Sequence, residues 1–71
     1  MNARQDIIKE LKSHADGASN ITISQFAAYM GLHPNTAGKK LYGLPYFPAG
    51  TRKLYFVGDI ADMIIEERKQ G

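Results

Sequence analysis

The stretch that decides the fold runs from Thr22 to Leu41 and reads TISQFAAYMGLHPNTAGKKL. It opens with a capping-box pattern, because the Thr22 side chain and the Gln25 side chain three residues later can each accept a hydrogen bond from a free backbone N–H at a helix start. Gly31 provides a left-handed stop, so the first helix is predicted over residues 23–30. Its inward-facing side chains are predicted to be Phe26, Ala27 and Met30.

A second helix follows after a short turn and is predicted over residues 34–42. Pro34 suits the first helical position because the N–H that it lacks would have no helical partner there, and His33 is then the cap residue. Two short helices joined in this way form a helix-turn-helix, which braces the second helix so that it can enter the major groove of DNA. Ala37 and Leu41 are predicted to face the core. The outward residues are predicted to be Asn35, Thr36, Gly38, Lys39 and Tyr42, with Lys40 at the border.

The outward residues of this recognition helix are predicted to contact DNA, and so are His33 and Lys40. An Asn such as Asn35 can make paired hydrogen bonds to adenine, and Lys39 can reach guanine or a phosphate. Thr36 lies near the helix start, where a phosphate is attracted by the helix dipole and by free N–H groups. Gly38 has two interpretations: close approach to DNA or another helix, or a tolerated weakness in the helix.

A β-hairpin is predicted over residues 46–57, where two aromatic-rich runs flank a Pro/Gly/Thr centre. Thr51, Arg52 and Lys53 lie beside its tip, in the position of a wing that would lie along a phosphate backbone or reach into the minor groove. The alternation of apolar residues does not decide which face of the second strand points inward. One set is Leu54 with Phe56, and the other is Tyr55 with Val57.

Two further helices are predicted at the ends of the chain. Residues 2–15 carry an apolar stripe at helical spacing, with Asn2 as a cap and Gly17 beyond the end. Residues 18–21 are a short connection. The last helix is predicted over residues 59–68. The fold class is therefore mainly α with a small β-hairpin, a winged helix-turn-helix in which residues 1–71 form a single domain.

Residues 21–66 resemble the excisionase/MerR-type winged helix-turn-helix superfamily. The Thr22–Thr36 segment is similar to the pattern T-h-x-E-h-A-x-h-h-G-h-S-p-x-T of that superfamily, where h is apolar, and Gly43-Leu44-Pro45 is similar to a later landmark. The small members that it resembles are excisionases of phages and mobile elements and AlpA- or Cox-like regulators. The resemblance implies that Thr22 caps the bracing helix, that Thr36 and Lys39 face DNA, and that Arg52 lies in the wing.

The sequence departs from the family pattern at three positions. His33 replaces the usual Ser cap, Gln25 replaces the commoner Glu, and Gly38 replaces a larger outward residue. The helix over residues 2–15 is outside the pattern, and it either completes the core or pairs with a second subunit.

Composition narrows the class of protein. The 71 residues include no Cys, and the two His residues are far apart in sequence, so neither disulfides nor a metal site are expected. No acidic residue occurs between Asp16 and Asp59, a stretch that contains four Lys and Arg residues. This uneven distribution of charge favours a protein with one face that binds a polyanion. With no apolar run of spanning length and no signal-peptide pattern, we expect a cytoplasmic protein without membrane contact or cofactor.

The sequence therefore predicts a double-stranded DNA-binding protein that is either an excisionase, acting as a recombination directionality factor, or a small transcriptional regulator. An integrase or recombinase, or a second copy of the chain, is the expected protein partner. The alternative is a protein-interaction module that uses the acidic last helix. An enzyme with a small-molecule substrate is not expected, because the chain has no nucleophile elbow and no phosphate-cradling loop. Aromatic residues of the hairpin could stack on bases, but packing is the simpler interpretation.

Overall fold

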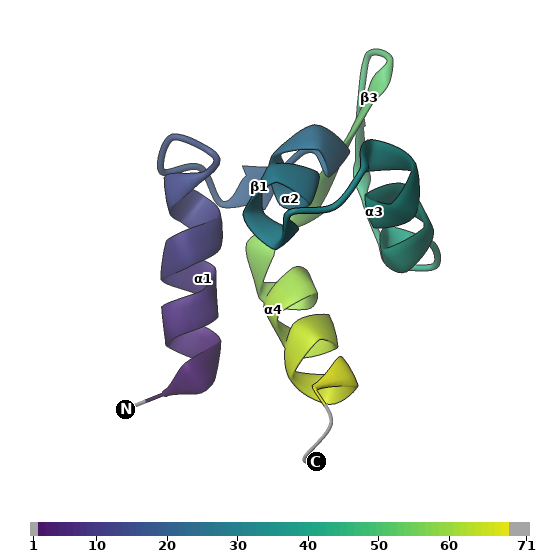
Figure 1. Ribbon diagram of the computed structural model, residues 1–71. Helices are drawn as coiled ribbons and strands as arrows, with labels where there is room; N and C mark the ends of the chain where they lie inside the picture. Colours follow the sequence, from purple (N-terminus) through teal and green to yellow (C-terminus); the bar gives the residue numbers. More distant parts are fainter. Residues whose placement is uncertain (1, 69–71) are drawn as a thin grey trace.

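The structure is a computed structural model that describes residues 2–68, which form four helices and a three-stranded antiparallel sheet (Figure 1). This arrangement is compatible with a winged helix-turn-helix. The elements in chain order are α1 (Ala3–Ser13), β1 (Asn20–Ile21), α2 (Ile23–Met30), α3 (Pro34–Leu41), β2 (Phe47–Ala49), β3 (Arg52–Phe56) and α4 (Val57–Glu67).

Helix α1 begins at Ala3, one residue after the predicted start, and it also ends earlier than predicted. The Asn2 side chain accepts hydrogen bonds from two backbone N–H groups of the first turn, which confirms it as the cap. The helix ends at Ser13 rather than at residue 15, and the chain then reverses through Asp16 at φ 53° and Gly17 at φ 85°. The left-handed stop thus includes a non-glycine residue, a conformation that Asp tolerates better than most residues.

Helix α2 spans the predicted residues and has the predicted capping box. The Thr22 hydroxyl accepts from Gln25 N at 3.2 Å, and the Gln25 side chain accepts from Thr22 N at 2.9 Å. Gly31 ends the helix at φ 71°. Met30 was predicted to face inward, and this is wrong: it is 38% exposed.

Helix α3 starts at Pro34 and ends at Leu41, so Tyr42 is the residue that caps it rather than part of its last turn. Ala37 and Leu41 are fully buried, as predicted. The chain leaves the helix through Gly43, whose φ of 94° is easily reached only by glycine.

The hairpin lies between α3 and α4, and its β3 strand pairs on both sides. β2 pairs with β3 through Phe47–Leu54 and Ala49–Arg52, while β1 pairs with the other edge of β3. Strand β1 was predicted to be a plain connection; the pairing of Ile21 with Tyr55 corrects this. Of the two faces left open for β3, the buried one is Tyr55 with Val57.

The position of Val57 shows that the predicted end of the wing and the predicted start of the last helix are both wrong. It was predicted to end the hairpin over residues 46–57, but it is the first residue of α4, which therefore starts two residues before the predicted residue 59 and ends at Glu67. Its N–H donates to the Ser19 carbonyl at 2.9 Å, and its side chain is 1% exposed. This buried junction joins the sheet directly to α4 without a loop.

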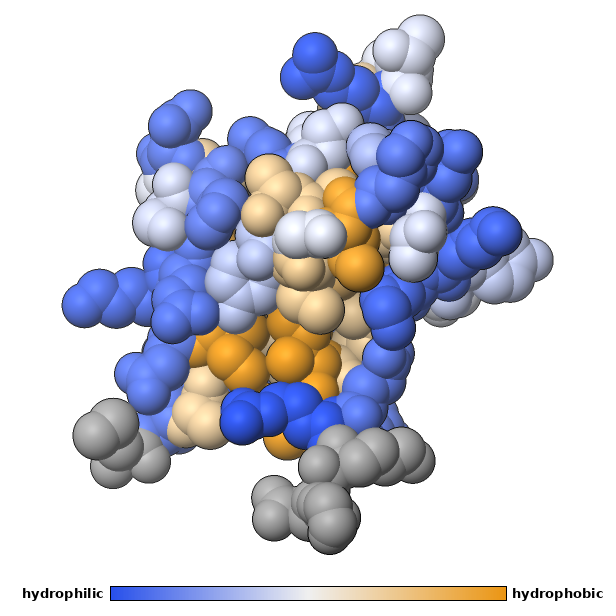
Figure 2. Space-filling view, viewed as in Figure 1, coloured by the Kyte–Doolittle hydropathy of each residue, from blue (hydrophilic) through white to orange (hydrophobic). Residues whose placement is uncertain are grey.

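The core lies where α1, α2, α3 and α4 meet the sheet. Its largest fully buried side chains are Phe26, Leu11, Ile21, Leu41, Ile60 and Val57. Helix α1 lies beside α4 and contributes Leu11 to this core, so it completes the core (Figure 1). In the same view, Figure 2 shows apolar side chains between α1 and α4, framed by hydrophilic ones. The wing projects at the end of the molecule opposite to the start of α1 and the end of α4 (Figure 1).

Candidate nucleic-acid interface

The start of α3 is held by the residue that precedes it. The His33 Nδ1 atom accepts a hydrogen bond from Asn35 N at 3.1 Å, so Nδ1 is unprotonated in this role. Pro34 follows at the first helical position. The predicted cap is confirmed, and the His33 ring is therefore engaged in building the helix.

The residues on α3 divide between a buried side and an outward side. At about 100° per residue, Gly38, Tyr42, Asn35 and Lys39 occupy one continuous arc of about 100°. Asn35 and Lys39 are exposed, and Tyr42 is 89% exposed. Thr36 is also exposed and lies about 60° beyond this arc, next to Lys39. The arc is the surface that α3 offers to a partner.

Lys40 lies apart from this arc. It is about 140° around the helix from Asn35, and its Nζ atom is 3.2 Å from a carboxylate oxygen of Glu67 on α4. Both side chains are partly exposed, so the ion pair adds little stability. It nevertheless directs Lys40 towards α4 and away from the outward residues of α3.

The wing presents its cations next to a turn at Gly50, whose φ is 65°. Thr51, Arg52 and Lys53 are all exposed. The Lys53 ammonium lies 4.9 Å from the centre of the Tyr46 ring, which is a cation–π contact at the hairpin. The Tyr46 ring in turn lies 5.9 Å from the ring of Tyr55, which is 3% exposed. The base of the wing is thereby tied to the core.

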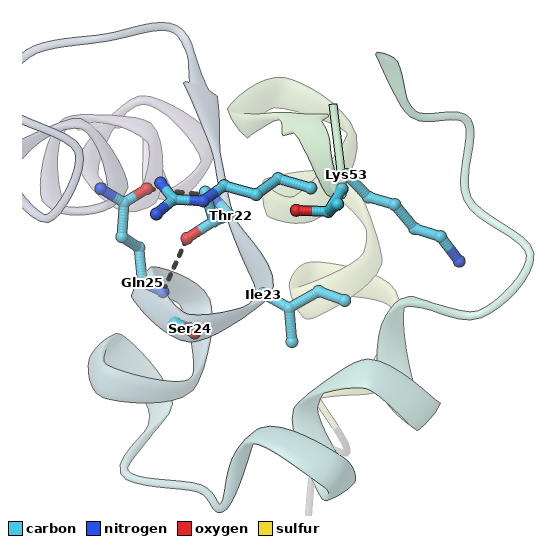
Figure 3. A pocket seen from close by; sticks show the side chains of 7 residues that line it. Thr22, Ile23, Ser24, Gln25 and Lys53 are labelled. Carbon is cyan, nitrogen blue, oxygen red and sulfur yellow. Dashed lines mark hydrogen bonds between the residues drawn. The ribbon is translucent and has the colours of Figure 1, made fainter. Parts of the chain in front are cut away.

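Two adjoining hollows connect the wing to α3, and Ile23 lines both. The first, of about 500 Å³, lies between the start of α2 and the wing and is lined by Thr22, Ile23, Ser24, Gln25, Thr51, Arg52 and Lys53. Figure 3 shows the α2 residues on one side of it and Lys53 on the other. The second lies along the outward arc of α3 and is lined by Ile23, Pro34, Asn35, Gly38, Lys39 and Tyr42. Together they form one surface, called here the α3–wing surface.

The α3–wing surface carries positive charge. No carboxylate of residues 2–68 lies within 4.0 Å of the charged nitrogens of Lys39, Arg52 or Lys53. No acidic residue occurs between Asp16 and Asp59, so none is adjacent in sequence either. Of the predicted DNA-binding residues, the surface brings together Asn35, Lys39, Tyr42, Thr51, Arg52 and Lys53. Thr36 lines neither hollow, His33 is the cap of α3, and Lys40 points towards α4.

Sequence reasoning missed a polar contact between α1 and α2. The Tyr29 hydroxyl donates to a Glu10 carboxylate oxygen at 2.9 Å, and the His14 ring lies edge-on to the Tyr29 ring at 5.4 Å. Partial burial, then the hydrogen bond to Glu10 and its charge, raise the pKa of Tyr29 to about 12. The sequence offers no signal for this contact, because its residues come from two separate segments of the chain. None of the three lines the α3–wing surface.

Sequence and structure comparisons with known proteins found no matching family model, no similar curated protein and no similar solved structure. The resemblance to excisionase/MerR-type proteins therefore stays a prediction. Within residues 2–68, no helix has both the length and the apolar character needed to span a bilayer. The same residues contain no grouping of three or more acidic or His side chains suited to a metal ion.

Proposed function

We propose that this chain is a sequence-specific double-stranded DNA-binding protein with a winged helix-turn-helix fold. The observation that carries the proposal is the α3–wing surface, on which Asn35 and Lys39 from one helix adjoin Arg52 and Lys53 from a hairpin, with no acidic group among them. Cationic groups on such a surface can contact the phosphates of DNA, and an amide group can form hydrogen bonds with the edges of its bases.

In the proposed complex, α3 enters the major groove, which is about 12 Å wide and accepts one helix. Asn35 and Lys39 lie on its outward arc and read base edges there. The hollow between α2 and the wing is lined by hydroxyl groups and by Arg52 and Lys53, and it takes a sugar–phosphate strand that borders the groove. The wing then follows the backbone or reaches into the minor groove.

The biological role that we propose is excisionase-like control of recombination or control of transcription. The longest dimension of the described residues is 38 Å, about one helical turn of DNA. One molecule therefore covers too few base pairs for high specificity, and we propose cooperative binding by several copies or binding beside a recombinase.

The alternative of a protein-interaction module on α4 has less support. Asp62 lies 2.7 Å from the Arg4 guanidinium, and Glu67 is paired with Lys40. Two of the acidic groups of α4 thus already have intramolecular partners.

A mobility-shift titration at two salt concentrations tests the proposal. The probe is the DNA that flanks the coding region of the protein. Lys39→Ala and Arg52→Ala should each weaken binding. Each should also reduce the slope of log affinity against log salt by about one for every phosphate that the removed side chain neutralises. Lys9→Ala is the matched control, because Lys9 is exposed on α1 and lines neither hollow of the α3–wing surface.

Each outcome of the titration supports or overturns a specific part of the proposal. Discrete, salt-sensitive shifts that weaken in both variants and persist in Lys9→Ala support the proposal, and a ladder of shifts favours cooperative binding. Wild-type-like binding by both folded variants would overturn the assignment of the surface. No shift even at low salt would overturn DNA binding itself.

A further inference from the structure

The middle of α3 has an apolar hollow where a base-reading helix usually carries a side chain. Gly38 has no side chain, and the floor beside it is Ile23, whose Cδ1 and Cγ2 atoms lie 3.9 Å from where a Gly38 Cβ would be. Pro34 and the Tyr42 ring border the same hollow. Nothing within the described chain requires Gly38 to lack a Cβ atom, since 3.9 Å is an ordinary contact distance.

The rim of this hollow is polar and positively charged. Asn35 and Lys39 line it together with the apolar groups, and the cations of the wing lie across Ile23 in the adjoining hollow. An occupant must therefore carry a small apolar group next to hydrogen-bonding groups on a negatively charged body. In the major groove the C5-methyl of thymine is the apolar group that base edges present.

We propose that the hollow at Gly38 binds the C5-methyl group of a thymine in double-stranded DNA and makes this position a determinant of sequence preference. The inference rests on the proposed DNA-binding function and deepens it. Ile23 supplies the contact surface for the methyl, Gly38 leaves room for it, and the Asn35 amide pairs with adenine nearby.

The spacing along α3 sets the register of this readout. Asn35 and Gly38 are three residues apart, a rise of about 4.5 Å along the helix. Neighbouring base pairs are about 3.4 Å apart. This rise corresponds to about 1.3 base-pair steps, so the thymine whose methyl is bound lies within two base pairs of the adenine that Asn35 reads.

The test uses duplex DNA selected by the wild-type protein from a random pool. Each thymine in the selected site is replaced in turn by deoxyuridine, which removes the methyl and keeps the base pairing. Burying one methyl corresponds to a change of about fourfold in affinity. We expect a decrease of that size at one thymine, within two base pairs of the position where Asn35→Ala relaxes the preference.

Two variants complete the design. Gly38→Ala adds a methyl to the hollow in a helix that accommodates it, so thymine and deoxyuridine should bind it equally well while its salt slope stays that of the wild type. Ala28→Gly is the control for a glycine–alanine exchange elsewhere, because Ala28 is exposed on α2 and lines neither hollow. It should keep the fourfold preference.

Each result has one meaning. The fourfold preference in the wild type and its absence in Gly38→Ala support the inference. Equal binding of thymine and deoxyuridine at every position, with salt-sensitive binding intact, overturns the inference and leaves the proposed function standing. An unchanged preference in Gly38→Ala also overturns it, because the methyl would then bind elsewhere. Absence of any DNA binding overturns the proposed function itself.

Discussion

Replacing Gly38 by Ala should stabilise the folded protein by about 0.5–1 kcal/mol. Gly38 lies inside α3 and does not have the positive φ that favours glycine, so Ala can adopt its conformation. The added Cβ would meet two atoms of Ile23 at 3.9 Å, which is ordinary van der Waals contact. The stabilisation comes chiefly from the unfolded chain, because Ala has fewer backbone conformations to give up on folding.

Thermal and urea unfolding of the two proteins, followed by circular dichroism, measure this effect. For a domain of this size, 1 kcal/mol changes the Tm by about 4–8 °C, so we expect a rise of about 2–8 °C with an unchanged m-value. Gly31→Ala is the matched control: Gly31 has φ 71°, so the same exchange should lower stability by about 1 kcal/mol or more.

A Gly38→Ala protein with an unchanged or lower Tm, beside the expected destabilisation of Gly31→Ala, would refute the reasoning. It would mean that the surroundings of Gly38 are tighter than the 3.9 Å distances indicate, or that the helix is distorted there. The stability measurement is independent of DNA, so it also establishes that a change in methyl preference in this variant is not a consequence of unfolding.

Three further perturbations test the fold. Thr22→Ala removes one half of the capping box and should cost about 1 kcal/mol in unfolding free energy, whereas Thr22→Ser should retain most of it. Leu11→Ala should cost about 2–5 kcal/mol in urea unfolding, because Leu11 is fully buried, and a cost below about 1 kcal/mol would mean that α1 is not part of the core. The pKa of Tyr29 is raised to about 12, chiefly by burial and then by Glu10. The stabilisation that comes from this shift is complete below pH 10. It is lost between pH 10 and 12, because the Tyr29 hydroxyl ionises at a lower pH in the unfolded chain than in the folded protein. Tyr29→Phe should make stability less steeply pH-dependent in that window, and identical slopes in the two proteins would contradict the interaction.

Local signals in the sequence predicted the helices well. The Thr22–Gln25 capping box, the Pro34 start and the Gly31 stop each concern backbone groups within four residues, so residue identity and spacing suffice to place them. The same locality explains the errors at helix ends. Whether Tyr42 continues α3 depends on small differences in backbone free energy that sequence patterns do not resolve.

Other features depend on partners distant in the chain. Strand β1 has only two residues, too few to show a period, and it exists because Ile21 pairs with Tyr55 and is fully buried. The start of α4 at Val57 follows from burial of that side chain at the junction with the sheet, which the alternation of apolar residues left open between two faces.

The features of the candidate interface also fall into these two groups, local ones and ones that depend on distant parts of the chain. The sequence by itself determined the caps of α2 and α3, the stop at Gly31, the excess of cations between Asp16 and Asp59, and the polar outward arc of α3. Composition, capping patterns and a period of 3.6 residues are properties of the chain alone. Only the tertiary structure decided which cations lie on one surface. It directs Lys40 to Glu67 and places Ile23 beside Gly38 and between the two hollows. The physical reason is that packing free energy, which depends on the shapes of elements that meet in space, sets these contacts, and no local pattern encodes it.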